Sequence, residues 1–206
     1  MRRPFFKAAD DDVRESMREE NITMIERVAS AAEKIGASLI EVPLVDDSSV
    51  YTTGEWIAMQ KFIHEVADTA QAHHVTIGVE TDFDPPHFNE FLRQAEDAGV
   101  MANYDTGNSS GIGYDHYEEI TTLDKRIANV HIKDRKLHGM TMKLGTGSAN
   151  FDDVFRALKE VGYCGSIIMQ AARGEDGKEA ESIRSQIEFV KGYVKKYGLE
   201  DARNNE

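Results

Sequence analysis

Apolar and polar positions along the chain follow two periods, one typical of helices and one typical of buried strands. Apolar side chains recur at helical spacing from residue 12 to about residue 35, and Gly36 follows where a helix C-terminal glycine belongs. Pro85 and Pro86 open another helix, over residues 88–98, which Gly99 ends. Further helices are predicted over residues 53–73, 117–123, 151–161 and 179–197.

Short and nearly continuous apolar runs lie between these helices. They predict strands over residues 38–45, 75–79, 100–104, 127–132 and 165–169. Strands this apolar are buried on both faces by flanking helices, as in a parallel sheet. Five strand-helix repeats therefore indicate an α/β fold. No linker-like change in composition interrupts them, so we predict a single domain over residues 1–206.

Polar segments separate the elements. A loop rich in Gly and Ser is expected after Asp105, and a long polar loop over residues 133–150. The charged tail, residues 199–206, is expected to fray.

Composition narrows the classes of partner and compartment. The net charge of -13 argues against a nucleic-acid surface, which needs clustered Lys and Arg. No apolar run approaches the roughly 20 residues of a membrane-spanning helix. The N-terminal Met-Arg-Arg-Pro-Phe-Phe reaches Asp10 without a hydrophobic segment, so export is not expected. The one cysteine, Cys164, excludes an intrachain disulfide and favours a reducing, cytoplasmic location; we interpret it as a buried strand-edge residue.

Four of the predicted strands each carry one metal-capable side chain where the strand ends. These side chains are Glu80, Asp105, His131 and Gln170, at intervals of 25, 26 and 39 residues, each about one strand-helix unit. In a barrel of parallel strands, the C-terminal strand ends converge on one mouth, where ligands and catalytic groups gather. The pattern therefore predicts a metal-centred enzyme.

Four segments in order resemble a known family. They are Ile-Gly-Val-Glu-Thr-Asp (77–82), Asn-Tyr-Asp-Thr-Gly-Asn (103–108), Val-His-Ile-Lys-Asp-Arg (130–135) and Leu-Gly-Thr-Gly (144–147). Together they resemble the sugar phosphate isomerase/epimerase family of xylose-isomerase-like TIM barrels, over residues 13 to 190. A closed barrel of this kind has eight strands and typically about 250 residues. The resemblance implies an incomplete parallel (β/α) barrel that lacks the first three strands and keeps five strand-helix units.

The resemblance also implies a ligand set and a reaction. Family members bind one divalent cation, often manganese. The resemblance implies that the ligands in this chain are Glu80, Asp105, His131 and Gln170. Carboxylate and imidazole ligands suit Mn²⁺, Mg²⁺, Co²⁺ or Zn²⁺, and the sequence does not choose among them. The implied chemistry is proton abstraction next to the carbonyl of a sugar or sugar phosphate, through a metal-stabilised enediolate. Glu80 is the candidate ligand and base.

Gln170 departs from the family pattern, which has a second Glu at this position. An amide oxygen can bind a cation, but an amide does not exchange a proton as a carboxylate does. A two-base epimerisation is therefore put in doubt, whereas a one-base isomerisation through Glu80 survives. The alternative is a non-catalytic partial barrel that keeps metal or sugar binding without turnover.

Further candidates surround these positions. On a strand, Lys133 shares a face with His131, so it is a candidate for contact with a substrate phosphate or hydroxyl, with a solvated loop cation as the alternative. Arg135 carries the same two interpretations, and Asn108 binds a substrate hydroxyl or serves as a turn residue. Arg173 is a candidate for holding an anionic substrate group near the metal.

Two other expectations concern partners. A metal-dependent endonuclease of the same broad superfamily would need a richer His and Glu cluster, and the acidic charge opposes DNA. An open five-stranded sheet would expose apolar edges and helix faces, which predicts a homo-oligomer.

Overall fold

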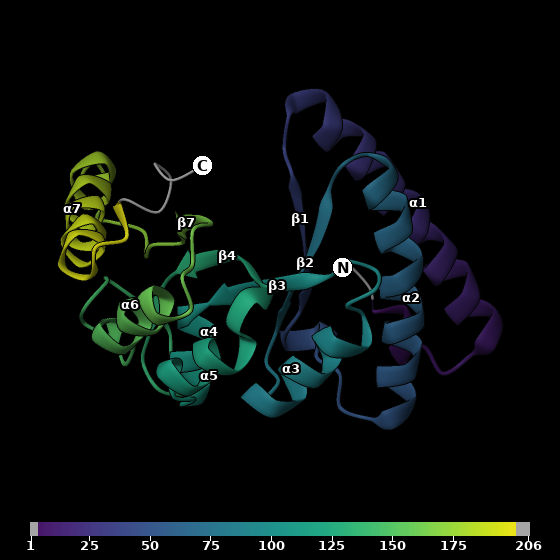
Figure 1. The fold of residues 1–206 in the computed structure, drawn as a ribbon. Helices are drawn as coiled ribbons and strands as arrows, with labels where there is room; N and C mark the ends of the chain where they lie inside the picture. The colour runs from purple at the N-terminus through teal and green to yellow at the C-terminus, as the bar shows by residue number, and fades with distance from the viewer. Residues whose placement is uncertain (1–3, 201–206) are drawn as a thin grey trace. The chain divides into compact units, whose positions relative to one another are not determined.

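The computed structural model describes residues 4–200 of the chain (Figure 1). These residues form two compact units. Unit 1 comprises the residues up to Phe83 together with His87–Ala102, and unit 2 comprises Asp84–Pro86 and the residues from Asn103 onward. The predicted single domain stays a prediction. The start of the signal-like N-terminus, residues 1–3, and most of the predicted fraying tail, residues 201–206, lie outside the described residues.

Five parallel strands confirm the predicted α/β class. Their order in the sheet follows their order along the chain: β1 (Leu39–Leu44), β2 (Thr76–Thr81), β3 (Met101–Asp105), β4 (Ile127–Ile132) and β7 (Ser166–Met169). A closed barrel of this type has eight strands. The described residues therefore contain five of that number, as predicted. Strand β3 begins in unit 1 and ends in unit 2.

Helices alternate with these strands. They are α1 (Asp11–Ile35), α2 (Thr53–Ala72), α3 (Pro85–Gln94), α4 (Thr106–Ile112), α5 (His116–Leu123), α6 (Phe151–Glu160) and α7 (Glu179–Tyr197). Three 3-10 turns and one short hairpin complete the described chain: η1 (Phe5–Lys7), η2 (Asp46–Ser48), η3 (Asp124–Arg126), β5 (Asp134–Arg135) and β6 (Thr141–Met142). Each predicted helix is confirmed within a few residues. None of the helices in residues 4–200 is long and apolar enough to cross a bilayer.

Side-chain caps explain why the longest helices begin and end where the sequence predicts. The Asp10 carboxylate accepts a hydrogen bond from the Val13 backbone N–H at 2.9 Å, and Gly36 ends α1 at a φ of 72°. At the start of α2, Thr52 and Glu55 each accept from the other's backbone N–H. These contacts satisfy backbone groups that the helix itself leaves unpaired.

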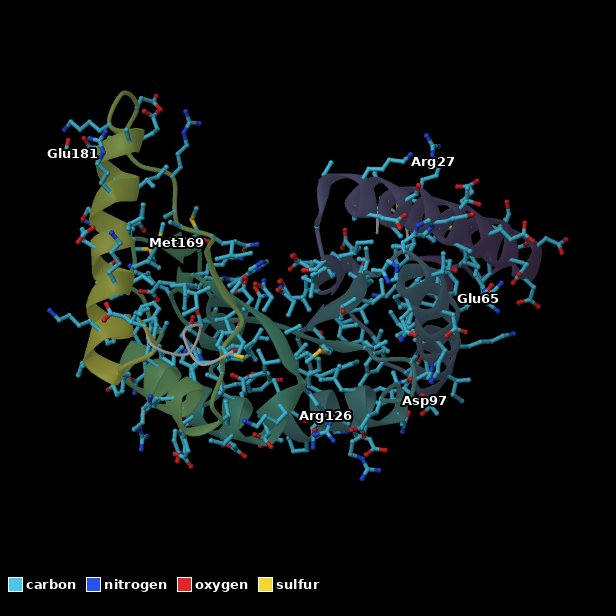
Figure 2. All side chains as sticks on the ribbon, turned by 45° about the horizontal axis from the view of Figure 1, so that its top comes forward. Arg27, Glu65, Asp97, Arg126, Met169 and Glu181 are labelled. Carbon is cyan, nitrogen blue, oxygen red and sulfur yellow. The ribbon has the colours of Figure 1, made fainter. Side chains whose placement is uncertain are left out.

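Each unit has its own apolar core. In unit 1, α1 packs on α2 (Figure 1), and Phe5 contacts Phe62 with ring centroids 5.1 Å apart. In unit 2, α6 contacts both α5 and α7, and the rings of Phe155 and Tyr193 stack with centroids 5.2 Å apart. Charged side chains such as Arg27 on α1 and Glu181 on α7 point away from these helices (Figure 2).

Three local expectations are wrong. The segment rich in Gly and Ser after Asp105 is helix α4 rather than a loop. Strand β7 is not buried on both faces, since Ile168 is 46% exposed. Cys164, just before β7, is exposed rather than buried. Among the described residues, β7 pairs only with β4 and lies at the edge of the sheet.

Candidate active site

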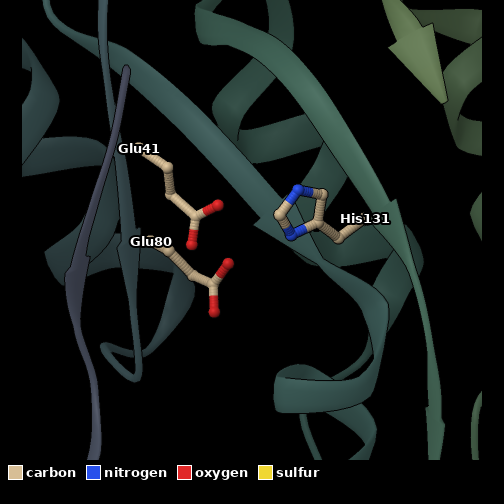
Figure 3. A group of neighbouring side chains, drawn as sticks. All are labelled: Glu41, Glu80 and His131. Atoms are coloured by element: carbon tan, nitrogen blue, oxygen red, sulfur yellow. The ribbon is translucent and has the colours of Figure 1, made fainter. Parts of the chain in front are cut away.

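Unit 1 presents two carboxylates on adjacent strands. Glu80 on β2 pairs in register with Pro43, and Glu41 on β1 pairs with Gly78. Because side chains alternate with period two, Glu41 and Glu80 point to the same face of the sheet. Their carboxylate oxygens lie within 4.8 Å of each other. Figure 3 shows the two side chains on neighbouring strands. Glu80 is only 6% exposed.

Glu41 is a residue that the sequence analysis missed. It lies in an apolar strand, and its side chain is half-buried. The available signal was a lone carboxylate inside an apolar run. A charged side chain in such a run either faces solvent or serves a site, because burying an unpaired charge is costly.

Unit 2 presents a polar face on β3 and β4. Asn103 and Asp105 project from β3, and Asn129, His131 and Lys133 follow with period two along β4 and just beyond it. The Asn103 Nδ2 atom lies 3.2 Å from His131 Nδ1, and Asn129 Nδ2 donates to Asn103 Oδ1 at 2.6 Å. Apart from Lys133, all of these side chains are buried.

Asp105 connects this face to α4. Its Oδ1 atom accepts from the backbone N–H groups of Gly107 at 2.7 Å and Asn108 at 2.9 Å, which makes it the N-cap of the helix. The other carboxylate oxygen lies 3.6 Å from Lys133 Nζ. A Cβ atom on Gly107 would lie 2.5 Å from Lys133 Cγ, so the glycine allows the lysine to cross α4 and reach Asp105. The shared face predicted for His131 and Lys133 agrees with this arrangement.

The remaining predicted site residues of unit 2 are placed differently. Asn108 is buried in α4, whereas Gln170 is exposed just after β7, with its backbone N–H donating to Ile132 O at 3.0 Å. Arg135 donates from Nε and Nη2 to the carbonyl of Gly139, at 3.1 Å in each case. Arg173 is 79% exposed and pairs with Asp176 at 3.1 Å. The roles predicted for these residues stay predictions.

Each unit offers donor atoms of types that a divalent cation accepts. In unit 1 these are the carboxylate oxygens of Glu41 and Glu80, and in unit 2 they are the imidazole nitrogens of His131. Carboxylate oxygens and a neutral imidazole nitrogen are ligands that Mg²⁺, Mn²⁺ and Zn²⁺ accept. Two carboxylates also balance a charge of 2+.

Comparison with known proteins identifies the family. The family model described as xylose isomerase-like TIM barrel matches residues 5–193. The chain belongs to this family. The resemblance predicted from the four sequence segments is thereby confirmed.

Relatives of known name are sugar-processing proteins. An inosose dehydratase of Geobacillus thermodenitrificans is 25% identical over 158 residues, which cover 64% of this chain and 52% of that protein. The L-ribulose-5-phosphate 3-epimerase UlaE of Salmonella paratyphi A is 24% identical over 208 residues, covering 97% of this chain and 72% of that protein. The chain thus spans about half the length of the first relative.

Solved structures agree on the fold. An IolI protein with a bound zinc atom has a TM-score of 0.77 and 20% identity, covering 94% of this chain and 74% of that one. An L-ribulose 3-epimerase has a TM-score of 0.72 and 18% identity, covering 98% of this chain and 74% of that one. The xylose isomerase-like barrel fold is therefore shared with these structures.

A second buried polar cluster in unit 2 was not predicted from the sequence. Tyr104 points to the opposite face of β3 from Asn103 and Asp105. Its hydroxyl lies 2.8 Å from His116 Nδ1 and donates to Glu119 Oε2 at 2.9 Å. Burial lowers the pKa of His116 from 6.5 to about 4 and raises the pKa of Glu119 from 4.5 to about 7. The fold therefore favours the neutral forms of both groups.

Replacing Glu119 with Gln is expected to reveal the effect of this burial on stability. Because folding raises the pKa of Glu119, the protonated side chain stabilises the folded protein. This contribution to the free energy of unfolding is fully present below about pH 4.5 and is lost as the pH rises through about 7. His116 behaves oppositely, keeping its contribution above about pH 6.5 and losing it as the pH falls through about 4. In the unmodified protein the two trends offset each other, so only a substitution separates them.

The free energy of unfolding of Glu119→Gln should exceed that of the unmodified protein by on the order of 2–3 kcal/mol at pH 8 and by almost nothing at pH 4. Urea unfolding across this pH range measures the difference. Glu118→Gln, an exposed neighbour on the same helix, is the matched control and should show no such trend. A pH-independent difference for Glu119→Gln would mean that Glu119 titrates normally in the folded protein.

Proposed function

We propose that this protein is a metal-dependent sugar or sugar-phosphate isomerase/epimerase. The observation that carries the proposal is the buried Glu80 carboxylate, near the C-terminal end of β2 and beside Glu41 of the neighbouring parallel strand. Ligands of parallel α/β folds bind at this end of the strands. The relatives named for inosose and ribulose-phosphate chemistry support a small sugar or sugar phosphate as the substrate.

The proposed cofactor is one divalent cation, with manganese as the first choice. We propose Glu80, Asp105, His131 and Gln170 as its ligands, and Glu41 as a further carboxylate donor. When bound, the cation polarises the substrate carbonyl and so favours loss of the neighbouring proton. The similarity in fold to a zinc-containing protein supports a divalent ion without identifying it.

The chain's own residues carry the proton transfer in this proposal. Glu80 removes the proton from the carbon next to the carbonyl and returns it to the former carbonyl carbon. The hydroxyl proton passes between the two oxygens of the enediolate, so that aldose and ketose are interconverted. Lys133, whose ammonium lies beside Asp105, stabilises negative charge on a substrate oxygen. Asn108 would bind a hydroxyl, and Arg135 and Arg173 an anionic group. Because Gln170 cannot exchange a proton as a carboxylate does, we favour isomerisation over two-base epimerisation.

Metal content tests the proposal directly. Protein purified without chelator should contain about one divalent ion per chain by mass spectrometry, and His131→Ala should lose it, because removing one imidazole donor weakens the site. His64→Ala, which removes a partly exposed imidazole from α2, is the control and should keep the ion. Absence of metal from the unmodified protein, with no thermal stabilisation by added Mn²⁺ or Zn²⁺, would reject the metal-dependent function.

One observation favours a second candidate. The exposed side chain of Gln170 contrasts with the buried side chains of Glu80, Asp105 and His131. A protein that binds metal or sugar without turnover would tolerate such an arrangement. Retained metal binding with no turnover across a panel of ketoses and ketose phosphates would favour this candidate. The homo-oligomer and the cytoplasmic location stay predictions.

A further inference from the structure

A line of buried amides in unit 2 ends on His131. Asn129 and His131 lie two residues apart on the same face of β4, and Asn103 reaches them from β3. Asn129 Nδ2 donates to Asn103 Oδ1 at 2.6 Å, and Asn103 Nδ2 lies 3.2 Å from His131 Nδ1. Asn129 is 3% exposed, Asn103 is 1% exposed and His131 is 5% exposed, so these hydrogen bonds are shielded from water.

The direction of these hydrogen bonds determines the state of the imidazole. With Asn103 Nδ2 as donor, His131 Nδ1 is the acceptor, and a neutral ring then carries its proton on Nε2. That ring has no lone pair left for a cation. If the side-chain amide groups of Asn103 and Asn129 both flip, so that their oxygen and nitrogen atoms exchange places, Asn103 Oδ1 accepts from His131 Nδ1–H. Asn103 Nδ2 then donates to Asn129 Oδ1. The number of hydrogen bonds between the three side chains is unchanged, and Nε2 then carries the lone pair that a cation needs.

We propose that Asn103 is a positioning residue that sets the tautomer of His131 and thereby decides whether Nε2 can bind a metal ion. The role of the cation rests on the function proposed above, whereas the coupling between the amide and the ring does not. Metal-binding histidines almost always donate their second ring N–H to an acceptor that holds the ring in place. The Asn103 side-chain amide contacts Nδ1, so its carbonyl oxygen would be that acceptor once the amide group has flipped. Asn129 affects His131 indirectly, because its side-chain amide must flip together with that of Asn103.

Substitutions at Asn103 separate the two directions. Asn103→Asp offers only acceptors when ionised and should hold the ring with its proton on Nδ1 even without metal. Asn103→Leu removes the contact and should weaken Zn²⁺ binding by about 10–100-fold, the range found when such supporting groups are lost. Zn²⁺ affinity is measured by calorimetry, and the tautomer by long-range ¹H–¹⁵N spectra of protein labelled at histidine.

Asn129→Asp provides a test that leaves both Asn103 and the ring intact. A carboxylate at position 129 accepts from Asn103 Nδ2 and so turns Asn103 Oδ1 towards His131. The variant should therefore shift the metal-free ring to the Nδ1–H form, as Asn103→Asp does. A contact that only fills space would not change the tautomer. The signals of His116, which bonds to Tyr104 instead, serve as the internal control and should stay in place.

The expected result is a metal-free ring protonated on Nε2, which moves to the Nδ1–H form when Zn²⁺ is added and is already in that form in both Asp variants. An unchanged tautomer in Asn103→Asp and Asn129→Asp would overturn the proposal, and these variants decide it even where Asn103→Leu fails to fold. A tautomer that follows the substitutions in a protein that binds no Zn²⁺ would keep the role of Asn103 in orienting the ring and reject the metal-dependent function.

Discussion

Glu80→Gln is expected to lower kcat/KM on ketose or ketose-phosphate substrates by about 10²–10⁴-fold, the usual contribution of a positioned general base. Glutamine has nearly the same shape and keeps one oxygen that can bind a cation, but it cannot accept the substrate proton. Because Glu80 lies almost fully buried on β2, the isosteric change should leave the packing around it intact. Turnover is measured on a panel of ketoses and their phosphates.

A parallel measurement of metal content separates the two roles assigned to Glu80. Glu80→Gln should retain most of the metal, whereas Glu80→Ala, which has no donor atom, should lose metal as well as turnover. Glu188→Gln, on the exposed side of α7, is the control and should behave like the unmodified protein. Turnover of Glu80→Gln equal to that of the unmodified protein would assign the base to another residue, with Glu41 the first to examine.

Asp134→Ala is expected to lower the free energy of unfolding by about 3–5 kcal/mol, because it removes the buried carboxylate that accepts three backbone hydrogen bonds. Asp134 is fully buried in β5, directly after Lys133. Its Oδ2 atom accepts from the backbone N–H groups of Gly145 at 2.9 Å and Gly147 at 2.8 Å, and Oδ1 accepts from that of Ala149 at 3.0 Å. The carboxylate thus holds the loop that follows β6 against the end of β4. Urea unfolding measures the change.

A graded series tests this explanation. Asp134→Asn keeps one acceptor oxygen and should cost less than Asp134→Ala. Gly147→Ala should also destabilise the protein, since its Cβ would overlap the Asp134 carboxylate and lie 2.8 Å from the Arg135 carbonyl oxygen. Asp176→Ala, whose side chain is 92% exposed, is the control and should change stability by less than about 0.5 kcal/mol. Equal stability of Asp134→Ala and Asp176→Ala would show that the loop is held by other contacts.

Local sequence was sufficient for most of the secondary structure. The cap residues Asp10 and Thr52 and the terminal Gly36 act within one turn of their helices, so their effect can be read from neighbouring positions. The apolar runs likewise predicted every strand of the main sheet, because burial on a sheet imposes its own pattern. The positions of Glu80, Asp105 and His131 at or near strand ends follow from the same pattern.

Local sequence did not predict the structure of segments in which packing against the rest of the fold outweighs the intrinsic conformational preference of the residues. The composition of α4 favours a loop, yet it is helical because Asp105 caps it and because residues 106–111 are buried against the rest of unit 2. Gln170 lies directly after the last residue of β7, and the exposure of its side chain depends on the surrounding fold, which no local pattern reports.

The surroundings of the candidate ligands were decided by the pairing of strands. Glu41 meets Glu80 only through the register of β1 with β2, and Asn103 meets Asn129 and His131 only because β3 and β4 lie next to each other in the sheet. Sequence alone supplied the chemical types and the faces on which they lie. The tertiary structure selected their partners, since hydrogen bonds between side chains depend on which residues of different strands stand opposite each other.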